Sequence, residues 1–422
     1  MKQFITIVAL LLAASLLGFA AGKQEAKEGA KAPAEPQSVR FWFWLDNPDA
    51  DPTPLFQKFA KENPAIKFIP ERVAWNTFYE KLLTSIAAGS PPDTSQVKLW
   101  WQPQLIEMNA LLPLDKHIAA WKGKDDIYDN VWNLTKYTDG KQYVVPHQMV
   151  ILYMYYRVDM FKELGISPAK TREEFLANAK KLTRDLNGDG TPDVYGFGIR
   201  GARGGHDWWG TFVLSSGARF FDEQGKSGLT TPEAIEANQW FIDLYRAHKV
   251  SPPTTPNDGF KEIVANMKSG LTATTIHHFG SSAEMDKALG DKIGASPVPR
   301  GTKGYWTSFG DGQTAVFAAS KAQEAAFRFN AFLSTGENNA EWQKYCGQVS
   351  VNKSQGRTAE AVANRFMKAT TESAAFAGIL PAHPRIAEFV ESVWPATMQR
   401  AFNGEITSQQ MMQAFADHFA KK

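Results

Sequence analysis

One stretch of the sequence decides the fold, and it reads GKQYVVPHQMVILYMYYRVDMFKELG over residues 140–165. It follows a turn signal, Asp-Gly at 139–140, and opens with a short strand that Pro146 stops. The next run, residues 150–156, is apolar and aromatic, which is typical of a buried strand. The stretch therefore predicts a crossing between two packed units without a long linker, and such a boundary favours a ligand cleft.

Strand and helix patterns alternate on the N-terminal side of this crossing. Apolar strands are expected at 39–44 and 66–73, with helices starting at Thr53-Pro54 and at Asn76. On the other side, Thr171 and Glu174 form a capping-box pattern that predicts a helix over residues 172–184. Alternation of this kind favours an α/β architecture.

The composition limits the classes of function. The 422 residues are 43% hydrophobic and 21% charged, which is enough chain for two domains or more. Lysine and arginine exceed aspartate and glutamate by only 46 − 44 = 2, so the charge gives no reason to propose nucleic acid or an anionic membrane as partner. Cys346 is the only cysteine, which excludes a disulfide or a thiolate metal cluster within one chain.

Several motifs, taken in order, resemble the family 1 extracellular solute-binding proteins, the capture components of ABC sugar importers. The crossing ends in VDMFKELGI at 158–166. The family usually has Tyr-Asn-Lys-Asp shortly before the phenylalanine, and this chain has Tyr156-Arg157-Val158-Asp159 there. Other matching segments are WNTFYEKL at 75–82, AAGSPPD at 87–93, LLPLD at 111–115 and FNGEITSQQMMQAF at 402–415. The resemblance runs from about residue 39 to residue 421.

The resemblance implies an α/β fold of two discontinuous lobes joined by a three-crossing hinge, the maltose-binding-protein-like type II periplasmic binding protein fold. Lobe one would comprise residues 39–148 and 271–318, and lobe two residues 149–270 and 319–422. The crossings are expected near Met149, Gly270 and Ala319. The resemblance further implies a monomeric, non-enzymatic protein that passes a sugar or oligosaccharide to ABC transporter permease subunits.

The N-terminus predicts export. Residues 1–20 have a lysine followed by an apolar run and small residues, the pattern of a cleavable signal peptide. Residues 21–38 are mostly Ala, Glu, Lys, Gly and Pro, and we expect a disordered tether because they cannot bury enough apolar surface. Since no cysteine follows the apolar run, we expect a periplasmic protein that is not a lipoprotein.

The tryptophans supply the candidate ligand contacts. Sugars have apolar ring faces on which aromatic side chains stack, and polar edges that charged and amide groups bind. The chain has 13 tryptophans, more than a core alone requires, although interdomain packing is the competing interpretation. The predicted ligand-binding residues are Trp44, Asp46, Trp75, His147, Trp208, Trp209, His278 and Trp306.

The segment DLNGDGTPD at 185–193 is a candidate structural calcium site, and no other cofactor is expected. Its oxygen-bearing residues follow the first half of a calcium loop: Asp185, Asn187, Asp189 and Asp193. The twelfth position, normally a bidentate glutamate, is Gly196. We therefore favour an Asx-turn loop whose side chains bind its own backbone.

Two further functions stay open. A secreted carbohydrate-active enzyme needs two carboxylates on either side of the scissile bond, and no recognisable catalytic motif contains such a pair. A binding protein for a phosphorylated polyol or a peptide is the other alternative. A phosphate group would require arginine in the cleft, and Arg200 or Arg203 could supply it.

Overall fold

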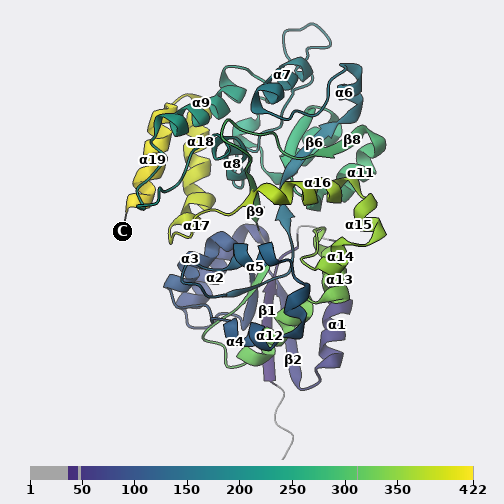
Figure 1. The fold of residues 1–422 in the computed structure, drawn as a ribbon, viewed down its shortest axis with the longest axis vertical. Helices are drawn as coiled ribbons and strands as arrows, with labels where there is room; N and C mark the ends of the chain where they lie inside the picture. Colours follow the sequence, from purple (N-terminus) through teal and green to yellow (C-terminus); the bar gives the residue numbers. More distant parts are fainter. Residues whose placement is uncertain (1–36, 46–48, 311, 422) are drawn as a thin grey trace, which may run out of the picture. The chain divides into compact units, whose positions relative to one another are not determined.

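The computed structural model describes residues 37–45, 49–310 and 312–421 (Figure 1). The larger of its sheets is built around the first strand of the chain. Five strands pair in the order β2-β1-β3-β10-β4; β1 is parallel to β2 and β3, and β10 is antiparallel to β3 and β4. Their bounds are β1 Gln37–Phe43, β2 Ile66–Arg72, β3 Thr94–Val97, β4 Val144–Pro146 and β10 Gln313–Val316.

Alternating side chains give this sheet a hydrophobic core on each face. Val39, Phe41 and Phe43 point to one core, and Trp42 and Trp44 to the other. Both faces are covered, as expected for strands in parallel pairs with helical connections. The surrounding helices are α1 Thr53–Glu62, α2 Trp75–Ala87, η1 Leu99–Trp101, α3 Gln102–Glu107, α4 Asp115–Ala120, η2 Lys122–Asp126, α5 Asp129–Thr135, α12 Gln323–Leu333, α13 Gly336–Cys346 and α14 Lys353–Gly356. We call this set of elements the first lobe.

A second, antiparallel sheet has the order β7-β6-β8. Figure 1 labels β6 and β8 of this sheet. Its strands are β6 Tyr153–Arg157, β7 Thr274–His277 and β8 Ile293–Ser296. Along β6 the side chains again alternate, with Tyr153 and Tyr155 in one core and Met154 in another. The surrounding helices are α6 Val158–Glu163, α7 Arg172–Leu182, α8 His206–Val213, α9 Pro232–Arg246, η3 Thr255–Asn257, α10 Phe260–Ser269, η4 Phe279–Ser281, α11 Ser282–Leu289, η5 Gly290–Lys292, α15 Ala359–Ala363, α16 Arg365–Ser373, η6 Ala374–Phe376, α17 Ile386–Glu388, the π-helix η7 Phe389–Val393, α18 Trp394–Asn403 and α19 Ser408–Ala420. We call this set the second lobe.

Short strands carry the chain from one lobe to the other. β5 (Val150–Ile151) connects β4 with β6, and β9 (Thr307–Gly310) leads into β10. These two strands pair antiparallel, and β11 (Ala377–Gly378) pairs parallel to β9. A third passage lies between α14, whose Lys353 contacts Asp129 at 3.0 Å, and α16, which packs on β8. The predicted class, two discontinuous α/β lobes, is confirmed.

The sheet membership of two segments differs from the expected lobe boundaries. Residues 271–296 were expected in lobe one, but β7 and β8 pair with β6. Helix α12 was expected in lobe two, but it packs on β1, β3 and β10. The chain therefore crosses near Met149 as predicted, but not near Gly270 or Ala319. The choice of sheet depends on contacts distant along the chain, which local sequence patterns do not reveal.

The N-terminal predictions fall mostly outside the described residues. The predicted signal peptide, residues 1–20, lies there entirely, and so does the predicted tether up to residue 36. The last two tether residues, Gln37 and Ser38, instead begin β1, where they pair with Ile66 and Lys67. Among the described residues, no helix has the length and apolar character needed to cross a membrane.

Candidate ligand-binding site

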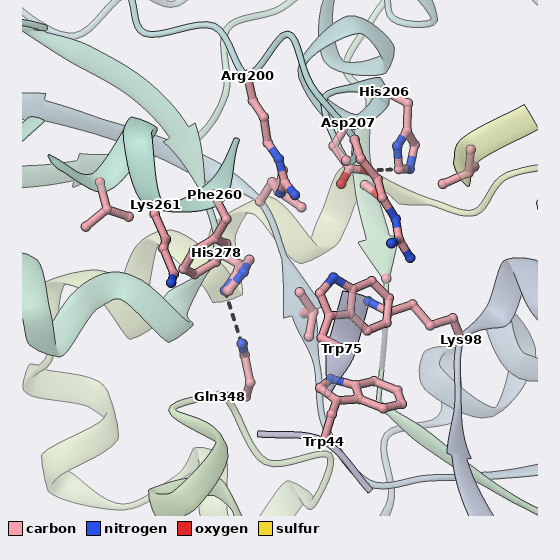
Figure 2. Close-up of a pocket in the computed structure, with 18 of the residues that line it drawn as sticks. Trp44, Trp75, Lys98, Arg200, His206, Asp207, Phe260, Lys261, His278 and Gln348 are labelled. Carbon is pink, nitrogen blue, oxygen red and sulfur yellow. Dashed lines mark hydrogen bonds and ion pairs between the residues drawn. The ribbon is translucent and has the colours of Figure 1, made fainter. Parts of the chain in front are cut away.

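A cavity of about 840 Å³ is lined by both lobes and by the crossing strands (Figure 2). The first lobe contributes Trp44, Trp75, Lys98 and Trp100. The second contributes Arg200, Asp207, Phe260 and His278, among others, and the crossing segments contribute Gln148, Val150, Ser308 and Gly310. In open sheets, ligands commonly bind beyond the carboxyl ends of parallel strands. Trp44 follows β1 and Lys98 follows β3, so both lie at such an edge.

Aromatic rings form one wall of the cavity. The ring centroids of Trp44 and Trp75 are 5.3 Å apart and their planes are inclined by 48°. The Lys98 ammonium lies 4.0 Å from the centre of the Trp75 ring, 4.7 Å from that of Trp100 and 5.5 Å from that of Trp44. Figure 2 shows the Lys98 side chain reaching the Trp75 ring. This cation–π arrangement holds the lysine beside the rings.

His278, which follows β7, offers a hydrogen-bond donor in the opposite wall. Its Nδ1 lies 3.0 Å from the Gly280 backbone nitrogen and 3.1 Å from Gln348 Nε2, both donors. Removal from water, together with the positive charges of Lys98 and Arg200, lowers the pKa of His278 to about 3. The imidazole is therefore neutral at physiological pH, and because Nδ1 accepts, its proton resides on Nε2.

Asp207 offers an acceptor. It lies in the first turn of α8, where a carboxylate is stabilised by the helix dipole. Its Oδ1 is 3.4 Å from His206 Nε2 (Figure 2). The His206 ring meets the Trp100 ring edge-on, with the ring centroids 5.7 Å apart. Oδ1 is buried toward His206, while the Asp207 side chain as a whole is 16% exposed and lines the cavity. A ligand hydroxyl can donate to the exposed part of this carboxylate.

The cavity is rich in charged side chains. Within the described part of the chain, its lining includes the cations Lys98, Arg200, Arg203, Lys261 and Lys268 and the carboxylates Asp207, Glu284 and Glu391. Lys268 on α10 and Glu284 on α11 pair at 2.6 Å. Arg203 and Glu391 also form an ion pair. Such groups can hydrogen-bond the polar edge of a ligand while the tryptophans contact its apolar face.

Three of the predicted site residues line the cavity: Trp44, Trp75 and His278. Asp46 lies outside the described residues. Sequence reasoning missed Lys98, Trp100, Asp207 and Phe260. Lys98 follows β3, a strand that the sequence analysis did not predict, at the edge where Trp44 also lies. For Asp207 the signal was its position before two tryptophans in a glycine-rich segment.

The prediction that Trp208 and Trp209 face the ligand is corrected by their burial. Both are on α8 and are 1% and 0% exposed. Trp208 Nε1 donates to the Gly198 carbonyl at 3.1 Å, and Trp209 Nε1 donates to Asn238 Oδ1 at 2.8 Å. The indoles thus fill the core of the second lobe. The glycine-rich segment before them had suggested an approach to a ligand, but α8 is buried on nearly every side, so both indoles pack in the core.

The predicted positions of His147 and Trp306 at the ligand are corrected as well, because neither lines the cavity. His147 is fully buried, and its Nδ1 accepts from Trp342 Nε1 at 3.0 Å. Burial lowers its pKa to about 3. Trp306 is half-buried against the second lobe, and its ring lies so close to Gly210 that a side chain at that position would collide with it.

The Asp185 loop hydrogen-bonds its own backbone. Asp185 accepts from the backbone nitrogens of Gly188 at 2.6 Å and Gly190 at 2.7 Å. Asn187 and Asp189 each accept from the backbone two residues on, both at 2.8 Å, and Asp193 accepts from the Leu186 nitrogen at 2.7 Å. No group of three or more His, Cys, Asp or Glu residues in the described ranges could hold a metal ion. This geometry favours the Asx-turn interpretation, and calcium binding stays an untested prediction.

The family of the chain follows from comparison with known proteins. A family model described as bacterial extracellular solute-binding protein matches residues 46–340. The chain belongs to this family, whose members are binding proteins.

Individual proteins similar to this chain are also binding proteins. A binding protein of Brucella abortus is 27% identical over 343 residues, which span 79% of this chain and 81% of the relative. The diacetylchitobiose binding protein DasA of Streptomyces coelicolor is 26% identical over 341 residues, 76% of each chain. An ABC transporter solute-binding protein of Thermotoga lettingae, bound with α-D-tagatose, has a similar fold, with a TM-score of 0.79, 20% identity, and coverage of 90% of this chain and 98% of that one.

Proposed function

We propose that the cavity binds a sugar or an oligosaccharide. The observation that carries this proposal is the pairing of an aromatic wall, Trp44, Trp75 and Trp100, with a donor, His278 Nε2, and an acceptor, the Asp207 carboxylate. Aromatic rings stack on the apolar face of a pyranose or furanose, while the hydroxyl groups at its edge both donate and accept hydrogen bonds. The relatives that carry a sugar in their names support this ligand class.

Capture works by closure of the two lobes around the ligand. Because side chains of both lobes line the cavity, a bound sugar contacts both and favours the closed state by its differential affinity. Hinge closure of this kind is the general motion of periplasmic binding proteins. The strands β5 and β9 and the segment between α14 and α16 absorb the rotation, which leaves each core intact.

The closed protein then delivers the sugar to the permease subunits of an ABC importer. It acts as a monomer in the periplasm, released from a cleavable signal peptide and without an acyl anchor. Fractionation tests this part: the mature protein should appear in the soluble fraction after osmotic release. Recovery only with detergent would contradict it.

A ligand screen separates this proposal from the alternatives. Thermal shift is measured with mono- and oligosaccharides, with polyols and their phosphates, and with peptides, and each mixture is analysed for products. We expect stabilisation by a sugar and no chemical change. Arg200 and Lys261 in the lining favour the phosphorylated polyol as the second candidate, because phosphate oxygens bind cationic side chains strongly. Product formation would instead support a carbohydrate-active enzyme.

A further inference from the structure

Glu391 and Arg203 form an ion pair at the edge of the cavity. Both belong to the second lobe: Arg203 precedes α8, and Glu391 lies in η7 beside Phe389 and Val390, which are buried in the core that contains α8. The side chains are 33% and 15% exposed. The pair is therefore partly shielded from water, where charged contacts are stronger than at an open surface.

The Glu391 carboxylate reaches two indoles of the first lobe. Its Oε1 accepts from Trp101 Nε1 at 3.1 Å and lies 3.3 Å from Trp100 Nε1. Both tryptophans belong to η1, which directly follows the sheet strand β3. Hydrogen bonds to an ionised carboxylate are roughly twice as strong as those between neutral groups. A single side chain of the second lobe thus fixes two ring positions in the first.

Arg203 makes a second set of contacts across the lobes. Its guanidinium carbon lies 5.0 Å from the centre of the Trp75 ring, and Nη1 is 3.4 Å from the Asn76 carbonyl oxygen. Both partners are at the start of α2 in the first lobe. A guanidinium over an indole face is a favourable cation–π contact. The ion pair with Glu391 orients this guanidinium, so the two residues act on the first lobe together.

The backbone around Glu391 has an unusual form with a local cause. Residues Phe389–Val393 form a single π-helical turn between α17 and α18. Pro395 has no backbone N–H to donate to the Glu391 carbonyl in the α-helical pattern. The helix widens there, and single π turns inside helices are frequent at functional sites. The wide turn carries Glu391 on the side of the cavity.

We propose that Glu391 and Arg203 form an interlobe clasp that favours the closed arrangement in the absence of ligand and positions Trp75 and Trp100 in the cavity wall. The apparent affinity of a protein whose binding-competent state is partly populated is reduced by that fraction. The clasp raises this fraction before any ligand arrives. Loss of one hydrogen-bonded charge contact would shift the closed-to-open ratio by roughly tenfold or more.

The test uses the ligand-free full-length mature protein, so its result does not depend on which ligand the cavity takes. Small-angle scattering compares wild type with Glu391→Gln and with Arg203→Ala. We expect a larger radius of gyration in both variants. The matched control is Glu284→Gln, which removes another carboxylate of the cavity lining, one that pairs with Lys268 inside the second lobe. This control should keep the wild-type radius.

A spectroscopic readout separates positioning from a general loss of stability. In Glu391→Gln, the indole N–H resonances of Trp100 and Trp101 should shift in nitrogen-15 NMR spectra, while Glu284→Gln leaves them in place. Thermal unfolding shows which variants are folded. If Glu391→Gln does not fold, Arg203→Ala provides the scattering comparison. Wild-type radii in the folded variants, or unmoved indole resonances in Glu391→Gln, would overturn the proposal. A failed sugar screen would leave this result untouched.

Discussion

Gln348 Nε2 lies 3.1 Å from Nδ1 of His278 and joins two parts of the chain that are 70 residues apart. Gln348 follows α13 of the first lobe, and His278 follows β7 of the second. The backbone N–H of Gly280 sets the tautomer of this histidine, and the Gln348 amide contacts the same nitrogen from the opposite lobe. A movement of Gln348 relative to the second lobe would therefore change a contact of the histidine whose Nε2 is offered to a ligand.

The buried histidines predict that stability falls as the solution is acidified. His147 and His277 are fully buried, and burial lowers the pKa of each below its ordinary value of 6.5. The unfolded chain therefore binds more protons below about pH 6.5, so the free energy of unfolding should drop by about 1.4 kcal/mol per pH unit for each histidine. Urea unfolding between about pH 7 and pH 5 measures this slope. His147→Gln should reduce it, and a stability independent of pH in this range would contradict the burial.

From the position of Trp75 in the aromatic wall we predict that its loss weakens sugar binding. Trp75→Ala removes a half-buried ring of the cavity, and sugar affinity should weaken by about 1–3 kcal/mol, the scale of one large apolar side chain. Titration calorimetry measures the change. Trp132→Ala is the control, because Trp132 is also half-buried in the first lobe but does not line the cavity. Equal losses in both variants would argue against stacking on Trp75.

For Trp209 we predict that substitution lowers the stability of the fold. Its indole is fully buried in the second lobe and hydrogen-bonded to Asn238. Trp209→Ala should lower the free energy of unfolding by about 3–5 kcal/mol, because the cavity left in the core cannot collapse completely. Urea unfolding gives this value directly. A variant of wild-type stability that has lost sugar binding would restore the original prediction of a ligand contact.

From the hydrogen bonds of the Asp185 loop we predict that the thermal stability of the protein does not depend on calcium. Its carboxylates already accept backbone N–H groups within the loop. A chelator should therefore leave the melting temperature unchanged, since no binding free energy is lost. Melting curves with EDTA and with added calcium, together with metal analysis of the purified protein, make the comparison. Bound calcium and a lower melting temperature in the chelator would support the calcium-site hypothesis.

Local patterns in the sequence predicted the elements of the fold. The apolar strands expected at 39–44 and 66–73 are present as β1 and β2. Of the predicted capping box, the Thr171 cap is confirmed, with Oγ1 accepting from the Glu174 nitrogen at 3.2 Å. The Glu174 carboxylate instead accepts from the Lys170 nitrogen at 2.8 Å, so the box is not completed. The sheet joined by β7 was predicted wrongly, because strand pairing is set by residues far apart in the sequence.

The site was predicted in part for the same reason. Trp44 follows β1 and Trp75 begins α2, and both line the cavity beyond the edge of the sheet where ligands commonly bind. Trp208 and Trp209 are on a helix whose orientation no local pattern fixed. Asp207, their neighbour, faces the cavity instead. Composition alone cannot distinguish a tryptophan of the wall from one of the core.

Binding of a sugar in the cavity between the lobes is the central claim, and titration calorimetry tests it most directly. The titrant is the sugar or oligosaccharide with the largest thermal shift in the screen, added to wild type, Trp75→Ala and Asp207→Asn. The account predicts saturable binding at one site, recovery of the sugar unchanged, and weaker binding in both variants. Absence of saturation with every sugar of the screen, or wild-type affinity in both folded variants, would contradict it.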